Sequence, residues 1–444
     1  MLLLAIFDSL PCMLAHKKKV LLGMSGGVDS SVSGVLLLQA GYEVVGAFMK
    51  NWSDCQWRED RRDAMRVAAK LGIEFHTLDF EAQYREKVVK NLFEEYAAGR
   101  TPNPDVLCNK HVKFDLFVRT ADELGCEFVA TGHYAKTVAS GSDGAIVAEI
   151  LNRSLPERPK PFGRAGLSKF DPDRKQSLEP DECVPTRRDG FPLLTIPKDT
   201  NKDQTYFLWA MSREVLGRVI FPLGDLTKPE VREIARAQEL SVAEKKDSVG
   251  ICFVGEVDIV EFLKMKIPVK PGPVMTTDGR KVGEHEGLAF FTIGQRHGIG
   301  TIGGGPPYYV VHKEAETNTL VVGTEVDPAL FSNELTAKDV NWLIGLQALG
   351  GVAVTAEILN RLRSQNLTAT ASSPLEVPSK AVPERFPCLA RIRYRQDLQK
   401  AQVEILEDRR IHVVFDEHQR AVTHGQSVVL YSEGGIVLGG GIIE

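Results

Sequence analysis

The residues from Gly23 to Ser31, Gly-Met-Ser-Gly-Gly-Val-Asp-Ser-Ser, constrain the fold of this chain more than any other stretch. They follow an apolar run and open a helical pattern, so we expect a buried strand, a glycine-rich turn and a helix in succession. Backbone amides and hydroxyls converge at such a helix N-terminus and form an anion-binding site. A glycine pair alone would favour a plain turn. However, Asp29, Ser30 and Ser31 are placed to cap the helix, which favours a phosphate site.

The same stretch resembles the phosphate-binding loop of ATP pyrophosphatases, written Ser-Gly-Gly-x-Asp-Ser, which Ser25 to Ser30 match in order. Those enzymes cut ATP between its α and β phosphates and leave AMP on the substrate. The stretch is not a Walker loop, because Val28 follows Gly27 where a Walker loop has its lysine. The resemblance therefore implies ATP binding with cleavage at the α phosphate.

Composition restricts the class of protein and its compartment. A chain of 444 residues exceeds one ordinary core and predicts two or three domains. The formal net charge of -5 means that any nucleic-acid contact has to come from local basic patches. Seven cysteines without a Cys-x-x-Cys pair fit a reducing cytosol. The apolar start is interrupted by Asp8 and has no basic segment before it, so we expect no signal peptide, no membrane span and a cytoplasmic protein.

Strand and helix patterns alternate through the first third of the chain, which predicts a doubly wound parallel sheet covered on both faces. Ligands of such sheets lie beyond the carboxyl ends of the strands, where the glycine loop, Met49 and Gly132 all fall. The expected strands are 20–24, 42–49, 74–80 and 127–131, and the expected helices after the first are 58–71, 83–98 and 110–124.

The later part of the chain reads as short alternating strands separated by glycines, over 268–322 and again over 387–443. We expect an ATP pyrophosphatase domain over 1–256, a central β domain over 257–330 and a C-terminal β-barrel domain over 331–444. Proline-rich stretches without periodicity predict irregular insertions at about 140–198 and about 345–382.

Two cysteines stand out from the other five. Cys108 follows a Pro-Asn-Pro turn and precedes a basic helical stretch expected from Lys110, so a helix N-terminus with Lys110, His111 and Lys113 nearby would lower its thiol pKa. Taken as a lone cysteine, it is more readily a buried structural residue. Cys252 lies in an apolar run bounded by glycines and is typical of a core cysteine in a short strand.

Eight short motifs lie along nearly the full length of the chain. They are Gly23–Ser30, Phe48–Trp52, Gly99–Lys110, Ala130–Tyr134, Lys202–Tyr206, Gly250–Phe253, Thr292–Arg296 and Arg391–Arg395. Together, and in this order, they make the chain similar to the tRNA-specific 2-thiouridylase (MnmA/TrmU) family. The two irregular stretches are longer than the family pattern requires.

The resemblance implies ATP-dependent 2-thiolation of the wobble uridine (U34) of tRNA. ATP adenylates the C2 oxygen and releases pyrophosphate, and sulfur then displaces AMP. Cys252 receives the sulfur as a persulfide from a cysteine desulfurase or sulfur-relay protein. Cys108 acts as the nucleophile, with a transient Cys108–Cys252 disulfide, and Asp105 completes the catalytic set. The resemblance also implies acceptor tRNAs for Lys, Glu and Gln.

The same resemblance assigns binding residues. Mg²⁺ is expected beside the carboxylate of Asp29. The ATP-binding residues are Gly23, Met24, Ser25, Gly26, Gly27, Val28, Asp29, Ser30, Met49 and Gly132. The residues expected to contact the target base or other parts of the tRNA are Asn103, Pro104, Asp105, His133, Lys202, Asp203, Gln204, Arg393, Tyr394 and Gln426.

Plainer interpretations exist for part of that set. His133 also fits a satisfied histidine at a strand end, and Thr200 to Asp203 has the form of a helix capping box. In Arg391-Ile-Arg-Tyr-Arg395, a strand with period two would place three arginines on one face, which suits RNA phosphates or the guarding of an edge strand.

Three other functions stay open at this point. An amide-forming ligase such as a GMP or NAD synthetase would share the loop, but no amidotransferase segment is evident. A two-cysteine sulfurtransferase could use an iron-sulfur cluster held by Asp105, Cys108 and Cys252, although the usual compact cysteine run is missing. An inert RNA-binding protein would keep the loop only as structure, but the intact Ser25, Asp29 and both cysteines argue against decay.

Overall fold

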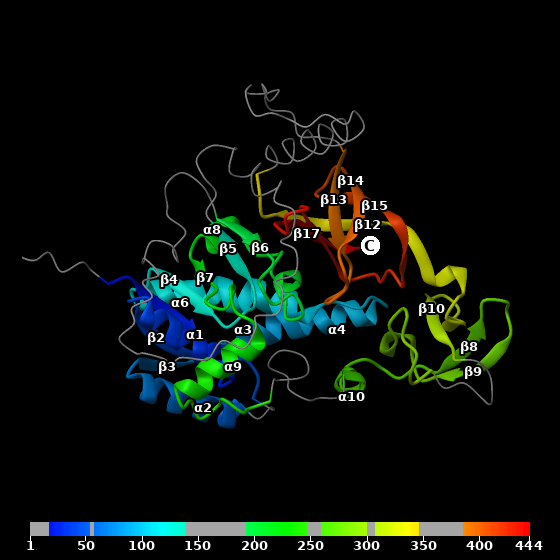
Figure 1. The fold of residues 1–444 in the computed structure, drawn as a ribbon. Helices are drawn as coiled ribbons and strands as arrows, with labels where there is room; N and C mark the ends of the chain where they lie inside the picture. The colour runs from blue at the N-terminus through cyan, green and yellow to red at the C-terminus, as the bar shows by residue number, and fades with distance from the viewer. Residues whose placement is uncertain (1–16, 54–56, 139–191, 247–258, 300–306, 346–384) are drawn as a thin grey trace, which may run out of the picture.

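The computed structural model describes residues 17–53, 57–138, 192–246, 259–299, 307–345 and 385–444 (Figure 1). Its first layer is a parallel sheet, and the fold class predicted from sequence is confirmed. Leu21 and Leu22 of the central strand are fully buried, one toward each face. In sheet order the strands are β3 (Glu74–Asp79), β2 (Glu43–Lys50), β1 (Lys19–Gly23), β4 (Phe128–Thr131) and β7 (Val219–Ile220).

Helices cover both faces of this sheet, because each carries an apolar stripe. On one face α1 (Val28–Gln39), α2 (Trp57–Leu71) and α9 (Lys228–Ala237) share a core with Leu22. On the other face α6 (Phe117–Glu123) shares a core with Leu21. The remaining helical segments here are α3 (Glu81–Tyr84), η1 (Arg85–Val89), α4 (Lys90–Ala97), α5 (Pro104–Leu107), η2 (Cys108–Leu116), η3 (Thr205–Phe207) and α8 (Arg213–Leu216).

A second, smaller sheet follows α10 (Ile259–Lys264). Its strands run in the order β10 (Tyr309–Glu314), β11 (Thr319–Gly323), β8 (Gly272–Thr276) and β9 (Lys281–His285), and only the β11–β8 pair is parallel. The short helix η4 (Leu288–Phe290) and α10 pack this unit against α4 through one shared apolar cluster.

The C-terminal strands close into a barrel above α4 in Figure 1. Around the barrel they are β12 (Phe331–Trp342), β15 (Ile411–Arg420), β14 (Gln399–Ile405), β13 (Arg385–Arg391), β16 (Ser427–Tyr431) and β17 (Val437–Ile443), and η5 (Pro328–Leu330) leads into β12. A hairpin of β5 (Lys136–Val138) and β6 (Leu193–Thr195) joins the first domain to the barrel, because Thr195 bridges to Ile436.

Some local predictions were wrong. The helix expected from Lys110 begins at Pro104 and runs without a break through η2 into α6, with Asn103 as its N-cap. β6 lies inside the stretch that we expected to be irregular up to about residue 198. The remainder of both expected insertions lies outside the described residues, apart from short margins, and so does the expected boundary at residue 256.

Candidate active site

The phosphate loop lies between β1 and α1 and is held in shape by its own serines. Ser30 Oγ accepts a hydrogen bond from the Ser25 amide (3.1 Å) and lies 3.3 Å from Ser25 Oγ. Gly26 has a φ of +76°, and a Cβ there would lie 2.2 Å from the carbonyl oxygen of Asp60. Only glycine fits this position, because both the left-handed backbone and the contact with α2 exclude a side chain.

Two further strand ends close around the loop. A Cβ on Gly132, just after β4, would lie 2.7 Å from the Ser30 amide nitrogen, so the two backbones touch. Met49, at the end of β2, brings its Cε within 3.2 Å of where a Cβ on Gly23 would be. The residues expected to bind ATP from Gly23 to Ser30, together with Met49 and Gly132, therefore gather at the carboxyl edge of the sheet, as doubly wound folds require.

Asp29, in the first turn of α1, has two strong partners. Lys228 Nζ, at the start of α9, donates to both carboxylate oxygens at 2.7 Å and 2.8 Å. The hydroxyl of Tyr134 donates to the same carboxylate at 2.9 Å. The lysine side chain is 11% exposed and the aspartate 31%, so the pair lies at the edge of the site and is only partly screened by water.

A second lysine fixes the loop from the outside. Lys245 Nζ donates to the Gly26 carbonyl (3.0 Å), to Asp60 (2.8 Å) and to Asp63 (2.7 Å). Hydrogen bonds to Asp60 and Asp63 outweigh the opposing effect of burial and raise the pKa of Lys245. The ammonium group therefore ties the loop to α2.

These residues fit a nucleoside triphosphate better than they fit a metal ion alone. The left-handed turn at Gly26 leaves the loop backbone without side-chain cover, and Lys228 supplies a cation beside it. Among the described residues, no group of three acidic, histidine or cysteine side chains could hold a metal ion. A single carboxylate, that of Asp29, is enough for a Mg²⁺ ion that is bound mainly through substrate phosphates.

Cys108 lies one turn inside the helix that Asn103 caps, rather than at its N-terminus as expected. Asn103 Oδ1 accepts from the Asp105 amide at 3.2 Å. The Cys108 side chain is 0% exposed. Of the basic residues expected to activate it, His111 contacts Asp115 (3.3 Å) and Lys113 faces His133 (3.5 Å).

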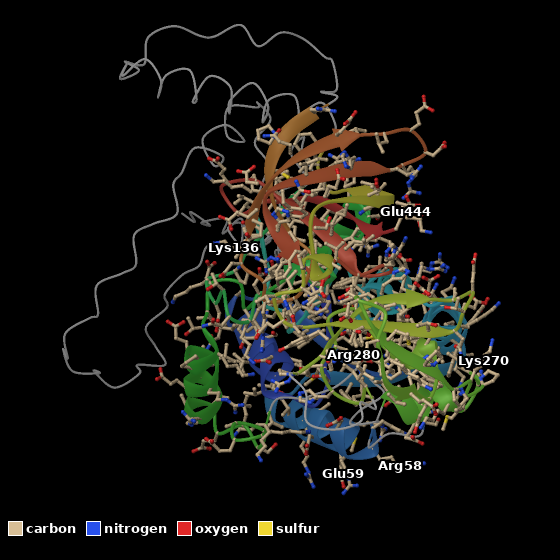
Figure 2. The ribbon with its side chains drawn as sticks, turned by 90° about the vertical axis from the view of Figure 1, so that its right-hand side faces the viewer. Arg58, Glu59, Lys136, Lys270, Arg280 and Glu444 are labelled. Atoms are coloured by element: carbon tan, nitrogen blue, oxygen red, sulfur yellow. The ribbon has the colours of Figure 1, made fainter. Side chains whose placement is uncertain are left out.

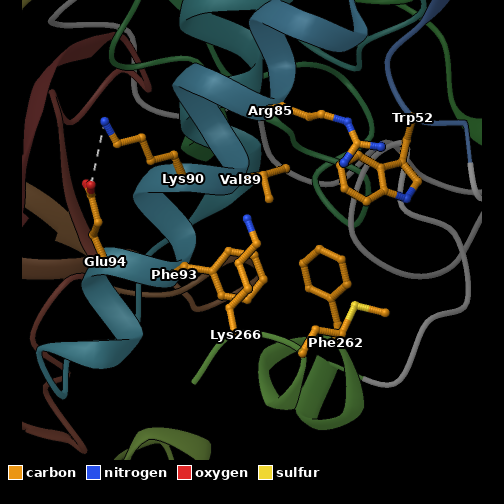
Figure 3. Close-up of a pocket in the computed structure, with 9 residues that line it drawn as sticks. Trp52, Arg85, Val89, Lys90, Phe93, Glu94, Phe262 and Lys266 are labelled. Atoms are coloured by element: carbon orange, nitrogen blue, oxygen red, sulfur yellow. Dashed lines mark ion pairs between the residues drawn. The ribbon is translucent and has the colours of Figure 1, made fainter. Parts of the chain in front are cut away.

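Cys108 belongs to the apolar cluster between α4 and α10. A pocket of about 330 Å³ opens in the same wall, lined by Trp52, Arg85, Phe93 and Phe262 among others (Figure 3). The Arg85 guanidinium stacks over the Trp52 ring at 4.0 Å. Cys252 lies outside the described residues, seven positions before Ile259, the first residue of α10. Phe262 and Leu263 of α10 belong to the same cluster as Cys108.

His133 is buried next to these elements. Thr131 Oγ1 lies 2.8 Å from its Nδ1. Burial, with a smaller effect of Lys113, holds the pKa of His133 well below its usual value. The imidazole is therefore neutral at physiological pH, which agrees with the interpretation of a satisfied strand-end histidine.

The loop from Lys202 to Gln204 joins the first domain to the barrel. Gln204 Oε1 accepts from the Tyr134 amide at 2.8 Å. Asp203, with 1% of its side chain exposed, pairs at 3.0 Å with Arg391, whose side chain is 8% exposed. No helix follows directly from the expected capping box, because Asp199 Oδ1 instead accepts the amides of Asn201 and Lys202 in a turn.

The arginine face expected at Arg391–Arg395 does not form. β13 ends at Arg391, and the chain then turns, with a φ of +65° at Arg395. Arg391 points inward to Asp203, whereas Arg393 Nη2 donates to the Ala421 carbonyl at 2.6 Å. Tyr394 packs against Phe207 with ring centroids 4.7 Å apart.

Gln426 reaches the segment that leads into the Asn103 cap. Its Nε2 donates to the carbonyls of Thr101 (2.9 Å) and Pro102 (3.3 Å). The Thr101 amide in turn donates to the His424 carbonyl at 2.9 Å. The barrel therefore clamps the residues expected to contact the target base.

Three family models match the chain in order: "tRNA methyl transferase HUP domain" over 18–154 and 184–256, "tRNA methyl transferase PRC-barrel domain" over 260–324, and "Aminomethyltransferase beta-barrel domain" over 364–443. The tRNA-specific 2-thiouridylase MnmA of Shouchella clausii is 41% identical over 433 residues, covering 96% of each chain. The chain belongs to the MnmA family. The MnmA of Bacillus subtilis is 39% identical, covering 96% of this chain and 95% of that protein. The family resemblance read from the motifs is thus confirmed.

Solved structures outside the MnmA family are more distant. One is a 4-thiouridine synthetase bound to RNA and ATP, with 16% identity, a TM-score of 0.29, and coverage of 56% of this chain and 50% of that chain. At that TM-score the likeness adds nothing to the MnmA assignment. Within the described part of the chain, every helix is too short or too polar to cross a membrane.

Sequence reasoning missed Lys228 and Lys245 in this MnmA site. Lys228 follows Thr227 in a Thr-Lys-Pro-Glu segment, and Thr227 and Glu230 form a capping box at the start of α9. That pattern signals a helix start and could have been read from sequence. The sequence could not show that Lys228 lies next to Asp29, which is 199 positions earlier.

Proposed function

We propose that this protein is an ATP-dependent sulfurtransferase that converts the wobble uridine of tRNA to 2-thiouridine, releasing AMP and pyrophosphate. The observation that carries the proposal is the alignment with curated 2-thiouridylases along 96% of the chain. The strand-end cradle for a nucleotide and the helix that carries Cys108 agree with that chemistry. An amide-forming ligase and an inert RNA-binding protein do not account for that alignment.

ATP activates a poor leaving group in the first step. The uridine C2 oxygen attacks the α phosphorus, the bond to the β-phosphate oxygen breaks, and pyrophosphate departs. The loop amides and Lys228 lie where negative charge develops, which lowers the barrier. Mg²⁺ bound by the phosphates would add positive charge there, with Asp29 as its protein ligand. Lys228 then has to leave Asp29 and move onto phosphate oxygens.

Sulfur replaces AMP in the second step. The Cys108 thiolate attacks the inner sulfur of a persulfide on Cys252, which forms a disulfide and frees hydrosulfide. Hydrosulfide adds to C2 and expels AMP, taking the place of the original oxygen. Two equivalents of a cellular thiol then reduce the disulfide by successive exchange, leave as their own disulfide, and reset both cysteines. The persulfide sulfur comes from a desulfurase or relay protein.

The packing of α10 supports the cysteine pair. Phe262 and Leu263 share an apolar cluster with Cys108. The seven residues from Cys252 to α10 can span at most about 25 Å, which sets the upper limit of the reach that the proposed thiol pairing needs. Cys108 is fully buried, so the proposal requires that RNA or ATP binding uncovers its thiol. The iron-sulfur alternative needs the same cysteines, and its test is whether activity requires bound iron.

The proposal assigns RNA contacts to the surface next to this helix. Asn103, Pro104 and Asp105 would face the target base, which a single-stranded loop can present unstacked at modest cost. Tyr394 borders the same region, because it packs against Phe207, whose carbonyl accepts a hydrogen bond from Asn109 of that helix. Lys202 and Arg393 are assigned to the RNA by the family resemblance. Asp203, Gln204, His133 and Gln426 act on the RNA indirectly, because each already holds a protein group.

The deciding test incubates the purified protein with ATP, Mg²⁺, unmodified tRNA and sulfide. AMP, pyrophosphate and 2-thiouridine in equal amounts support the proposal. ADP formation, or AMP without thiolated nucleoside, contradicts it.

A further inference from the structure

Three cations and one histidine, whose pKa is lowered by burial and by its basic neighbours, converge where the first domain, the central sheet and the barrel meet. Lys313 comes from β10, Arg420 ends β15, and Arg393 and His424 come from the barrel loops on either side. We call Lys313, Arg393, Arg420 and His424 the basic seam. The seam borders Thr101, which lies two residues before the Asn103 cap and whose hydroxyl lies 3.2 Å from that of Thr292 in the central domain.

The hydrogen-bonding capacity of the seam is largely unused. Arg420 packs its guanidinium 4.5 Å from the Tyr309 ring centroid, and its buried Nε and Nη2 have no hydrogen-bond partner. Arg393 donates to one carbonyl, that of Ala421, and Lys313 to one carbonyl, that of Phe291 (2.8 Å). Buried guanidinium nitrogens without acceptors are costly, which points to an anionic ligand.

No carboxylate of a described residue balances these charges. Among the residues that the structure describes, neither Lys313, Arg393 nor Arg420 pairs with an acid. Arg100, on the neighbouring loop, differs because Glu95 holds it at 2.6 Å and 2.7 Å. Burial lowers the pKa of Lys313 to about 8. Burial, and then the nearby Arg420, also lower the pKa of Arg393.

We propose that the basic seam binds a backbone phosphate of the substrate RNA beside the target base. This inference rests on the proposed function, since it takes tRNA as the ligand. Guanidinium forks match phosphate oxygens in geometry and charge. A phosphate there would satisfy Arg420 and fix the RNA next to the loop clamped by Gln426, which sets register without reading sequence.

The same site makes RNA binding depend on pH. Lys313 lies close to His424 of the barrel loop, and His424 in turn lies close to His312 of β10 and to the paired Arg100 of the first domain. A bound phosphate favours the charged ammonium and raises its pKa. RNA affinity is therefore full while Lys313 is protonated in the free protein and falls as the pH rises above about 8.

The test measures binding of an unmodified anticodon stem-loop RNA by fluorescence anisotropy at several salt concentrations. Arg420→Gln and Arg393→Gln should each raise Kd about tenfold or more and reduce the slope of log Kd against log salt by about 0.7. Arg385→Gln, on an exposed arginine at the other end of β13, and Lys270→Met, on the central domain (Figure 2), should change neither quantity.

The variant Lys313→Arg keeps a positive charge over the whole pH range of the test, because arginine is always protonated. It should bind RNA as tightly as the parent chain at pH 7 while losing the weakening between pH 7.5 and 8.5. Melting temperatures identify variants that fail to fold, and the pH profile of the unaltered chain needs no variant. Unchanged salt slopes in both arginine variants, or a flat pH profile, overturn the phosphate site. If the unaltered chain binds no RNA, the proposed function fails instead.

Discussion

The ammonium group of Lys228 lies 2.7 Å and 2.8 Å from the two carboxylate oxygens of Asp29, and it thereby occupies the carboxylate that Mg²⁺ would need. We expect Lys228 to exchange this partner for phosphate oxygens when ATP binds. Lys228→Met should then lower AMP formation about 100-fold while leaving RNA affinity unchanged. Lys198→Met is the matched control, because Lys198 pairs with Glu230 at the start of the same helix. Equal turnover in both variants would contradict this role.

Gly26 and Gly41 offer a matched pair in the left-handed backbone region. Their φ angles are +76° and +85°, but a Cβ would collide with Asp60 only at Gly26 and meets nothing within 4 Å at Gly41. Gly41→Ala should cost about 1 kcal/mol of stability and keep ATP binding. Gly26→Ala should abolish ATP binding measured by calorimetry. If both variants bind ATP alike, the loop is not the nucleotide site.

The buried pair of Arg391 and Asp203 joins the barrel to the first domain. Arg391→Met leaves a buried carboxylate unpaired and should lower the free energy of unfolding by about 3 to 5 kcal/mol. Adding Asp203→Asn should recover part of this loss, as measured by urea unfolding. The salt dependence of RNA binding should not change in the double variant. A reduced salt slope in the double variant would mean that Arg391 contacts the RNA.

The burial of His133 predicts that the protein becomes less stable as the pH falls. Because burial lowers its pKa in the folded chain, the unfolded chain binds more protons below the ordinary histidine value. The free energy of unfolding should be highest above about pH 6.5 and fall by up to about 1.4 kcal/mol per pH unit below it. His133→Gln should flatten this slope, leaving a smaller slope from His285 and His424, whose pKa values are also lowered. An unchanged slope would mean that His133 charges freely.

Sequence predicted the parts of this molecule that local pattern determines. The strand that enters the phosphate loop, the glycines of that loop and the closed barrel follow from apolar periodicity and turn chemistry. The contacts of Lys228 with Asp29, Lys245 with Gly26 and Arg391 with Asp203 join residues more than 180 positions apart. Single-sequence patterns carry no signal for such pairs.

The error at Arg391 has a physical cause. The period-two pattern of the sequence continues past Arg391, but β13 ends there and a left-handed residue at Arg395 turns the chain. The predicted position of Cys108 at a helix N-terminus is wrong for a related reason. The Asn-Pro pair is typical of a rigid turn, but here Asn103 caps a helix whose first residue is Pro104.

The central claim is that ATP cleavage to AMP activates a tRNA uridine for attack by sulfur handed over at Cys108. It is tested most directly by counting AMP and 2-thiouridine in one reaction of unmodified tRNA, ATP and a persulfide donor. The unaltered chain should give equal amounts of both, and Cys108→Ser should give no 2-thiouridine while its ATP affinity is unchanged. Normal 2-thiouridine formation by Cys108→Ser, or ADP as the nucleotide product, would contradict the account.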